Sequence, residues 1–314
     1  MSKKVYTVSL SPAIDYIIKV DNLVKGKTNR PFETDIYPAG KGIHVSMMLN
    51  NLGIKNKAII FSSGEFENFF YSGLKKINVN YKKFEAVSNI RINVKLIDKD
   101  QTEFSAQTSQ IKPRQLNLMK EYFGKELVEG DIVVFSGSIP KNTSETIYGE
   151  LVELVTKKQC LSVVDSFGVP LLKAIDQKPF LIKPNIEELS LTYNKKLGNF
   201  NDLRDLILKI ICTGVENVLV SMGKDGAALF TKERIYKCSI PTVGLELVNA
   251  AGAGDSMVAG FIYKYLETNN PLESLKFSII TGCATAFSNR IADIEMINEI
   301  LKYEKTINVE SLNW

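Results

Sequence analysis

Short runs of β-branched residues alternate along the chain with longer stretches whose apolar positions recur at helical spacing. Runs such as Asp131–Phe135 and Asn217–Ser221 are apolar on both faces, as the central strands of a parallel sheet must be. The predicted strands are Val5–Ser11, Lys57–Ser62, Asp131–Phe135, Leu161–Asp165, Phe180–Ile182 and Asn217–Ser221. The predicted helices are Ile43–Leu52, Pro113–Leu127, Ser144–Lys158, Asp202–Cys212, Asp255–Glu267 and Leu272–Asn289. This alternation predicts an α/β fold with a doubly wound, mostly parallel sheet flanked by helices.

Two segments break the alternation of strands and helices. Tyr16–Tyr37 and Phe84–Gln107 are extended, are polar at alternate positions and contain no long helix. In the second segment, Ile92, Val94 and Leu96 share one face, and the residues between them are polar. We expect a small, half-exposed β-sheet, separate from the main core, that forms a lid over a site.

The chain contains no internal repeat, no low-complexity tract and no linker rich in proline or serine. We therefore interpret residues 1–314 as a single domain, with lid segments near 14–38 and 84–108. Lysine and arginine number 39 against 35 acidic residues, a net charge of +4 that is too small to favour nucleic acid or a membrane surface as a partner. The uncharged stretches are too short to span a bilayer.

Scarce residue types exclude several classes of site. His44 is the only histidine, so a His-rich zinc site and a HExxH protease are excluded. The four cysteines form no CxxC pair, and the N-terminus has no signal-peptide core. We therefore expect a cytoplasmic protein with reduced, mostly buried cysteines.

A segment of small residues opens the predicted helix Asp255–Glu267. The backbone N–H groups of Gly252, Ala253 and Gly254 can converge there on an anion, which the helix dipole also favours. Asp255 in the first turn can then accept a proton from a hydroxyl group directed at a phosphorus atom. The alternative is an ordinary aspartate N-cap after a flexible loop.

A second glycine-containing segment lies just before the predicted helix Ile43–Leu52. Gly40 and Gly42 flank Lys41, an arrangement that suits close approach of the backbone to a phosphate or sugar, with Lys41 as a positive partner. The alternative is a turn with a solvated lysine. His44 is by default a packed residue or one at a helix N-terminus.

Three more polar segments follow predicted strands, at the sheet edge where α/β folds bind ligands. They are Ser136–Pro140, Lys183–Glu188 and Ser221–Gly226. Asn185 and Glu188 lie three residues apart at a helix start and can face one hydrated Mg²⁺, although Glu188 can equally be a capping residue. The third segment can also be a plain hairpin turn.

Together these segments resemble the ribokinase-like, or phosphofructokinase-B, family of sugar kinases over essentially the whole chain. The most specific segment is Gly252–Gly260, and Arg91–Lys95 resembles the branch of the family that acts on fructose 1-phosphate. The other matching segments are Ser11–Asp15, Ala39–His44, Ser136–Pro140, Lys183–Glu188 and Ser221–Gly226. The resemblance implies transfer of the ATP γ-phosphoryl group to the 6-hydroxyl of fructose 1-phosphate, giving fructose 1,6-bisphosphate.

The resemblance also implies a role for each site residue. Asp255 would be the base, and the backbone of Gly252, Ala253 and Gly254 would hold the transferring phosphoryl group. The sugar phosphate would contact Asp15, Gly40, Lys41, His44, Arg91 and Ser138, with Lys41 and Arg91 on its existing phosphate. ATP would face Lys183, Asn185, Ser221, Gly223 and Gly226, with Asn185 and Glu188 near Mg²⁺. Because the family's lid commonly contacts a second copy, the resemblance implies a homodimer through the lid.

The chain departs from the family pattern in three places. Ser11 stands where the family usually has asparagine, and Ala39 and His44 replace a glycine and an asparagine. After Glu103 the family commonly continues to an asparagine, whereas this chain has Phe104. Neutral histidine can donate to and accept from a sugar hydroxyl as asparagine does, but with a longer reach and a pH-dependent charge. These departures lie among the residues that would bind the sugar, whereas the phosphoryl-transfer segment matches the family. The sequence therefore defines the type of reaction better than the identity of the sugar substrate.

Other functions stay open at this point. Tagatose 6-phosphate or fructose 6-phosphate can replace fructose 1-phosphate, whereas Lys41, Arg91 and Lys95 give the pocket a basic character that a neutral sugar does not need. A non-catalytic sugar-phosphate sensor would not need Asp255. A nicotinamide dehydrogenase is disfavoured, because Met257 stands where the third glycine of the dinucleotide fingerprint belongs. No P-loop sequence is present either.

Overall fold

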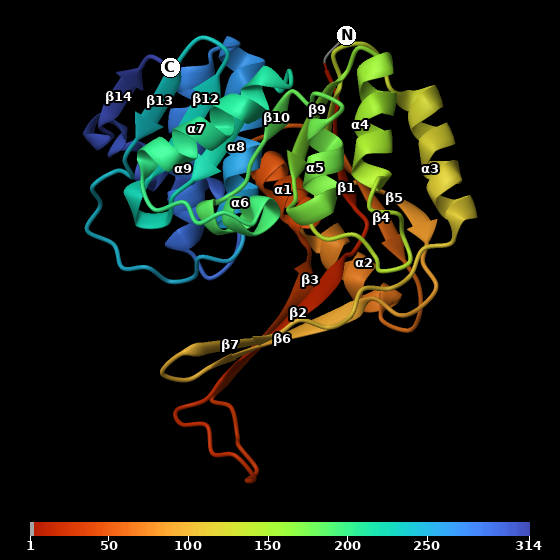
Figure 1. Ribbon diagram of the computed structural model, residues 1–314. Helices are drawn as coiled ribbons and strands as arrows, with labels where there is room; N and C mark the ends of the chain where they lie inside the picture. Colours follow the sequence, from red (N-terminus) through yellow and green to blue (C-terminus); the bar gives the residue numbers. More distant parts are fainter. Residues whose placement is uncertain (1–2) are drawn as a thin grey trace.

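A computed structural model describes residues 3–314, which form a ten-stranded sheet covered by helices and a separate four-stranded sheet (Figure 1). The strands of the large sheet are β1 Val5–Ser9, β4 Asn56–Ser62, β5 Tyr81–Glu85, β8 Ile132–Ser136, β9 Leu161–Asp165, β10 Leu181–Ile182, β11 Asn217–Ser221, β12 Ala227–Thr231, β13 Ile235–Cys238 and β14 Val309–Leu312. Their order is β14-β13-β12-β11-β10-β9-β8-β1-β4-β5. In this spatial order, all strands from β11 through β1 to β5 run parallel, and β12, β13 and β14 add an antiparallel edge.

The chain winds outward in both directions from β1. This strand pairs in parallel with β4 on one side and with β8 on the other. Such a reversal of strand order opens a crevice at the carboxyl ends of the strands, where ligands of α/β proteins bind. The predicted doubly wound, mostly parallel α/β fold is therefore confirmed.

Helices cover both faces of the large sheet. They are α1 Lys41–Asn51, α2 Glu67–Lys76, α3 Pro113–Glu126, α4 Ile147–Lys157, α5 Gly168–Ile175, α6 Ile186–Tyr193, α7 Phe200–Cys212, α8 Ala253–Thr268, α9 Pro271–Ala286 and α10 Ile294–Leu301, with short 3₁₀ turns at Gly223–Asp225 and Glu304–Thr306. Helices α3 to α7 contribute to one hydrophobic cluster, and α1, α8, α9 and α10 contribute to another. Within residues 3–314, no helix is both long and apolar enough to cross a bilayer.

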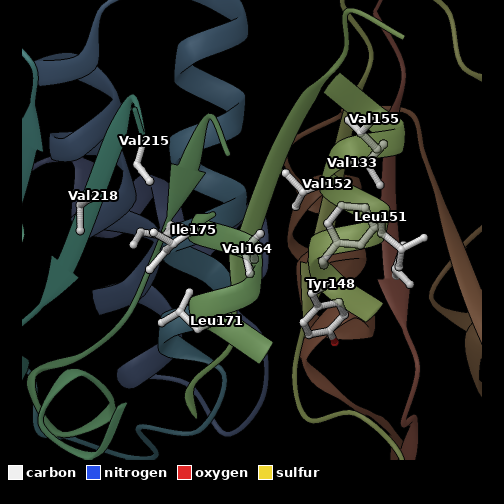
Figure 2. Packing of buried hydrophobic residues seen from close by; sticks show 14 of the residues in the cluster. Val133, Tyr148, Leu151, Val152, Val155, Val164, Leu171, Ile175, Val215 and Val218 are labelled. Carbon is white, nitrogen blue, oxygen red and sulfur yellow. The ribbon is translucent and has the colours of Figure 1, made fainter. Parts of the chain in front are cut away.

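The central strands are buried on both sides, as their sequences predict. In β8, Val133 and Phe135 pack into the cluster under α3 to α7, whereas Ile132 and Val134 pack into the cluster under α1 and α8. Figure 2 shows the first cluster, where Leu151 of α4 lies beside the strands. Burying a side chain of this size stabilises the fold by about 1.5–3 kcal/mol.

The four-stranded sheet projects away from the helices and extends below them in Figure 1. It consists of β2 Ala13–Lys19, β3 Glu33–Ala39, β6 Arg91–Ile97 and β7 Gln101–Phe104, in the order β3-β2-β6-β7. The polar side chains of Asn93 and Lys95 are only 7% and 5% exposed. The alternation of polar and apolar residues predicted which side chains of β6 share a face. Only the structure shows that the polar face is the buried one.

The predicted strands and helices are confirmed, with shifts at their ends. Leu161–Asp165 and Asn217–Ser221 have the predicted bounds, whereas the strand predicted to end at Ser11 ends at Ser9. The helix predicted to start at Ser144 starts later, at Ile147. The Ser144 hydroxyl accepts a hydrogen bond from the backbone N–H of Thr146, and such a local turn competes with helix formation.

Candidate functional site

A cavity of about 960 Å³ lies at the carboxyl edge of the large sheet and reaches the inner face of the small sheet. Its lining contains almost every residue that the sequence singled out, contributed by α1, α6, α8, β2, β6 and the turn after β11. These residues are Asp15, Gly40, Lys41, His44, Arg91, Lys183, Asn185, Glu188, Ser221, Gly223, Gly226, Gly252, Ala253, Gly254 and Asp255. Ser138 is not among the lining residues. Segments far apart in the sequence thus converge on one cavity.

The N-terminus of α8 forms one wall of this cavity. Gly252 has a φ of 83°, in the left-handed region, and a Cβ added there would lie 2.6 Å from Cδ1 of Ile291. A larger residue would therefore be strained at this position, where the helix begins. A Cβ on Gly254 would lie 3.1 Å from Nζ of Lys183, so a lysine ammonium group stands beside the loop. Backbone donors, a helix dipole and this ammonium group together suit an anion.

Asp255 lies in the first turn of α8 and is 5% exposed. The helix cap is Gly252, and no side chain makes a capping hydrogen bond there, so the alternative reading of Asp255 as an N-cap is wrong. Its Oδ2 atom lies 2.8 Å from Nδ1 of His44. A carboxylate at the edge of an anion site can accept a proton from a bound hydroxyl group.

Two lysines share one buried carboxylate in the centre of the site. Nζ of Lys41 and Nζ of Lys183 lie 3.2 Å and 3.4 Å from Oδ1 of Asp165, whose side chain is fully buried. Burial opposes ionisation of Asp165, but the two ammonium groups outweigh it and lower the pKa of this carboxyl group. Burial likewise opposes the charge on Lys41, yet Asp165, Asp255 and Glu188 raise its pKa. The ammonium group of Lys41 therefore stays charged within the cavity, where it pairs with Asp165 and Glu188 while the side chain is still 34% exposed.

The sequence analysis did not include Asp165 among the site residues. Its only signal was its place as the last residue of the predicted strand Leu161–Asp165, at the edge where ligands bind. Its Oδ2 atom is buried and has no hydrogen-bond partner within residues 3–314. Asn93 was also missed, although it lies on the polar face of a strand that was predicted.

Asn185 and Glu188 form a reciprocal capping box at the start of α6. The backbone N–H of Glu188 donates to Oδ1 of Asn185 at 2.7 Å, and the backbone N–H of Asn185 donates to Oε2 of Glu188 at 2.9 Å. The capping alternative is thus correct, but the other oxygen of Glu188 lies 3.3 Å from Nζ of Lys41, in the cavity. One carboxylate can serve both purposes because its two oxygens have separate partners.

The donor set is compatible with a magnesium ion held mainly by a bound nucleotide. No group of three or more histidine, cysteine, aspartate or glutamate side chains in the described part of the chain could hold a metal by itself. Mg²⁺ usually takes only one or two protein carboxylates and completes its shell with phosphate oxygens and water. The unpartnered oxygen of Asp165 and the nearby carboxylate of Glu188 fit that requirement.

The small sheet supplies the opposite wall. Oδ2 of Asp15 lies 2.8 Å from Nζ of Lys95, and Nδ2 of Asn93 donates to Oδ1 of Asp15 at 3.0 Å. Arg91 donates to Oγ of Ser105 and to the backbone oxygen of residue 106, and its buried Nε has no partner within residues 3–314. A buried guanidinium donor that is unpartnered is available to an anionic group of a ligand.

The turn after β11 is a hairpin, and it also lines the cavity. The backbone N–H of Met222 donates to the oxygen of Gly226, which has a φ of 88°. A Cβ on Gly226 would lie 2.0 Å from the backbone oxygen of Cys238, so only glycine fits. Ile279 and Phe287 add apolar side chains to the lining of the same cavity. Such a surface suits a flat heterocyclic ring.

Comparison with known proteins matches the chain to a family. Residues 2–290 match the family described as pfkB family carbohydrate kinase. A 1-phosphofructokinase of Bacillus subtilis (strain 168) is 36% identical over 297 residues, which are 95% of this chain and 97% of that protein. A D-tagatose-1-phosphate kinase of Bacillus licheniformis is 28% identical, covering 94% of this chain and 96% of that protein. A tagatose-6-phosphate kinase of Staphylococcus epidermidis (strain ATCC 12228) is also 28% identical, covering 97% and 100%.

Solved structures agree with the sequence relatives. The crystal structure of phosphofructokinase-2 from Escherichia coli in complex with potassium has a TM-score of 0.90 and 26% sequence identity. The match covers 97% of this chain and 100% of that one. The resemblance inferred from the glycine-containing segments is thus confirmed, whereas the relatives differ among themselves in the named sugar phosphate.

Proposed function

The chain belongs to the pfkB family of carbohydrate kinases and is a sugar-phosphate kinase; on this premise we propose that its acceptor is fructose 1-phosphate. The reaction transfers the γ-phosphoryl group of ATP to the 6-hydroxyl and gives fructose 1,6-bisphosphate. The observation that carries this proposal is the position of Asp255. It stands beside the backbone donors at the start of α8, in the same cavity as the cationic groups of Lys41 and Arg91.

In the proposed mechanism, Asp255 accepts the proton of the 6-hydroxyl as its oxygen bonds to the γ-phosphorus. A general base of this kind contributes about 10²–10⁴-fold to the rate. The backbone N–H groups from Gly252 to Gly254 hold the oxygens of the transferring group, because their position at the helix N-terminus is set before the substrate binds. Positioning and charge stabilisation supply most of the remaining catalysis in phosphoryl transfer.

The ammonium groups of Lys41 and Lys183 both contact Asp165 at the centre of the site. This shared contact supports a role for both ammonium groups close to the transferred phosphate. The sequence alone assigned Lys41 to the phosphate already present on the sugar. We therefore propose that Arg91, with its free Nε, binds that phosphate and that Lys41 acts between the two phosphate groups. Asp165 and Glu188 would face a nucleotide-bound Mg²⁺, which neutralises charge on the phosphate oxygens when it is present.

Other parts of the cavity would bind the sugar and the nucleoside. Asp15, held by Asn93 and Lys95, would accept hydrogen bonds from sugar hydroxyls. Ser221, Gly223 and Gly226 would face ATP, and Ser138 would have to approach the sugar through a shift of its loop, because it does not line the cavity. These assignments are the ones that the family resemblance implies, and for all of these residues except Ser138 their place in the lining of the cavity supports them.

The small sheet is proposed as a lid that also joins two copies of the chain. Its outer side exposes Phe104 (61%) and Ile36 (43%), and Phe32, just before β3, is 63% exposed. A solved structure of phosphofructokinase-2 from Escherichia coli is described as a tetrameric inhibited form, so that relative assembles into oligomers. Sedimentation of the chain with Ile36→Glu should show monomers where the unaltered chain shows dimers. A monomeric unaltered chain would contradict the proposal.

Kinases for tagatose phosphates are the second candidate, because relatives with those names cover nearly the whole chain. An ADP-release assay with ATP and Mg²⁺ decides between them. Fructose 1-phosphate, tagatose 1-phosphate, tagatose 6-phosphate, fructose 6-phosphate and free fructose are compared by kcat/KM. We expect at least a tenfold preference for fructose 1-phosphate, equivalent to about 1.4 kcal/mol in transition-state binding. A preference for any other acceptor overturns the proposed substrate.

A further inference from the structure

His44 contacts the carboxylate that the mechanism uses as its base. The Nδ1 atom of His44 lies 2.8 Å from Oδ2 of Asp255, and the imidazole is 13% exposed. The two residues are 211 positions apart in the sequence. His44 is on the first turns of α1, where its backbone N–H donates to Gly40 and its side chain makes no capping bond. This position agrees with the interpretation of His44 as a packed residue near a helix N-terminus, and the contact with Asp255 is additional to it.

The imidazole is held from two sides. Helix α1 packs against α8, so the backbones that carry His44 and Asp255 are fixed relative to each other. A Cβ added to Gly252 would lie 3.6 Å from Nδ1 of His44, which places the ring against the loop that precedes Asp255. The ring therefore has little freedom to leave the carboxylate.

The two oxygens of Asp255 have different surroundings. An ionised carboxylate only accepts hydrogen bonds, so Nδ1 of His44 must carry the proton and donate it to Oδ2. Within residues 3–314, Oδ1 makes no hydrogen bond, and Asp255 lines the cavity. One oxygen is thus fixed to the protein while the other remains available to a substrate hydroxyl.

We propose that His44 is a positioning residue that orients Asp255 for proton transfer. This inference rests on the proposed role of Asp255 as the base. The acceptor hydroxyl gives its proton to Oδ1, its oxygen bonds to the γ-phosphorus, and the bond from that phosphorus to the bridging oxygen of ADP breaks. The electron pair leaves with ADP, and His44 keeps its Nδ1 proton throughout. The imidazole thereby prevents rotation of the carboxylate away from the acceptor.

Amide variants separate positioning from other roles of the imidazole. The side-chain nitrogen of asparagine is separated from Cβ by the same two bonds as Nδ1 of histidine, whereas the nitrogen of glutamine is one bond further away. His44→Asn should therefore retain kcat to within about threefold. His44→Gln and His44→Leu should lower kcat by about 10²-fold, the loss typical of a misplaced catalytic group. The KM for ATP should stay the same in all three variants.

Three kinetic outcomes would overturn the proposal. Equal kcat values for His44→Asn and His44→Leu would show that the hydrogen bond does not matter. A loss in His44→Asn as large as that in Asp255→Asn would show that the imidazole itself takes the proton, because an amide cannot do so. A rise in the KM for sugar phosphate with unchanged kcat would make His44 a substrate-binding residue instead.

Nuclear magnetic resonance gives a test that does not depend on activity. Because His44 is the only histidine, the imidazole ¹H–¹⁵N signals of a tag-free chain belong to it alone. At a pH where the ring is neutral, we expect the proton on Nδ1, and Asp255→Asn should shift that signal. A neutral ring with its proton on Nε2 would overturn the proposal. If instead the chain phosphorylates none of the sugars, the Nδ1 signal still reports the contact, so failure of the proposed function is recognised separately.

Discussion

The ammonium group of Lys95 lies 2.8 Å from Oδ2 of Asp15, and both side chains are almost fully buried under the small sheet. Nδ2 of Asn93 donates to the other oxygen of the same carboxylate. This arrangement holds a negative charge where the proposed sugar hydroxyls bind. It also explains why polar residues of β6 face inward, because each of them has a charged or polar partner.

Asp15→Asn should weaken binding of the sugar phosphate. The amide keeps the shape of the side chain but removes the charge that pairs with Lys95 and accepts from sugar hydroxyls. Loss of a hydrogen bond to a charged group costs about 1.5–3 kcal/mol, so the KM for the sugar phosphate should rise at least tenfold. The KM for ATP, measured in the same assay, should not change. An equal rise in both KM values would show that Asp15 supports the fold of the cavity rather than the sugar.

Asp255→Asn should abolish nearly all turnover while both substrates still bind. The amide cannot accept the hydroxyl proton, and loss of the base should lower kcat by about 10²–10⁴-fold. The measurement combines the ADP-release assay with calorimetric titration of ATP and of fructose 1-phosphate. Retention of kcat would exclude Asp255 as the base.

Lys41→Met should lower kcat by about 10²–10³-fold with smaller effects on either KM. The ammonium group of Lys41 is held by Asp165 and Glu188 at the centre of the site, where charge develops in the proposed mechanism. Methionine keeps much of the length of the side chain, so loss of charge is the main change. A large rise in the KM for the sugar phosphate with unchanged kcat would restore the assignment made from sequence, in which Lys41 binds the phosphate already on the sugar.

Asp165→Asn should destabilise the protein in a pH-dependent way. Lys183 and Lys41 lower the pKa of Asp165 in the folded state, despite its burial. A carboxylate with a lowered folded-state pKa contributes stability above its unfolded-state pKa, about 3.9, and loses it as pH falls through the folded-state pKa. Thermal unfolding should therefore separate the variant from the unaltered chain at pH 7, and the difference should shrink below about pH 4. A difference that is constant with pH would contradict this account.

Gly252→Ala should damage the anion-binding loop. The backbone there has a φ of 83°, and the added methyl group would meet Ile291. A left-handed conformation costs an alanine about 1–2 kcal/mol, and the displaced loop should also lose kcat. Gly124→Ala is the matched control, because that glycine lies in α3 with no atom within 4 Å of the added Cβ. It should raise stability by about 0.5–1 kcal/mol and leave kcat unchanged. Equal behaviour of the two variants would exclude a special role for Gly252.

The sequence by itself determined the parallel centre of the large sheet, but not its edge strands β5, β12, β13 and β14. Runs such as Asp131–Phe135 are apolar on both faces, and only the centre of a parallel sheet buries both faces of a strand. Because polar segments followed those strands directly, their convergence at the carboxyl edge could be inferred without coordinates. The comparisons confirm the family and its general reaction, phosphorylation of a sugar phosphate, while the roles of individual residues stay proposals.

Only the tertiary structure decided how the charged groups pair. From the sequence, Asp165 was only the last residue of a predicted strand. In the structure its carboxylate forms ion pairs with Lys183 and with Lys41, which is 124 positions away in the sequence. His44 and Asp255 meet because α1 packs on α8, which no local pattern encodes. Periodicity shows which side chains share a face of a strand, but which face is buried depends on what packs against it. Contacts between distant segments therefore decided the detailed chemistry of this site.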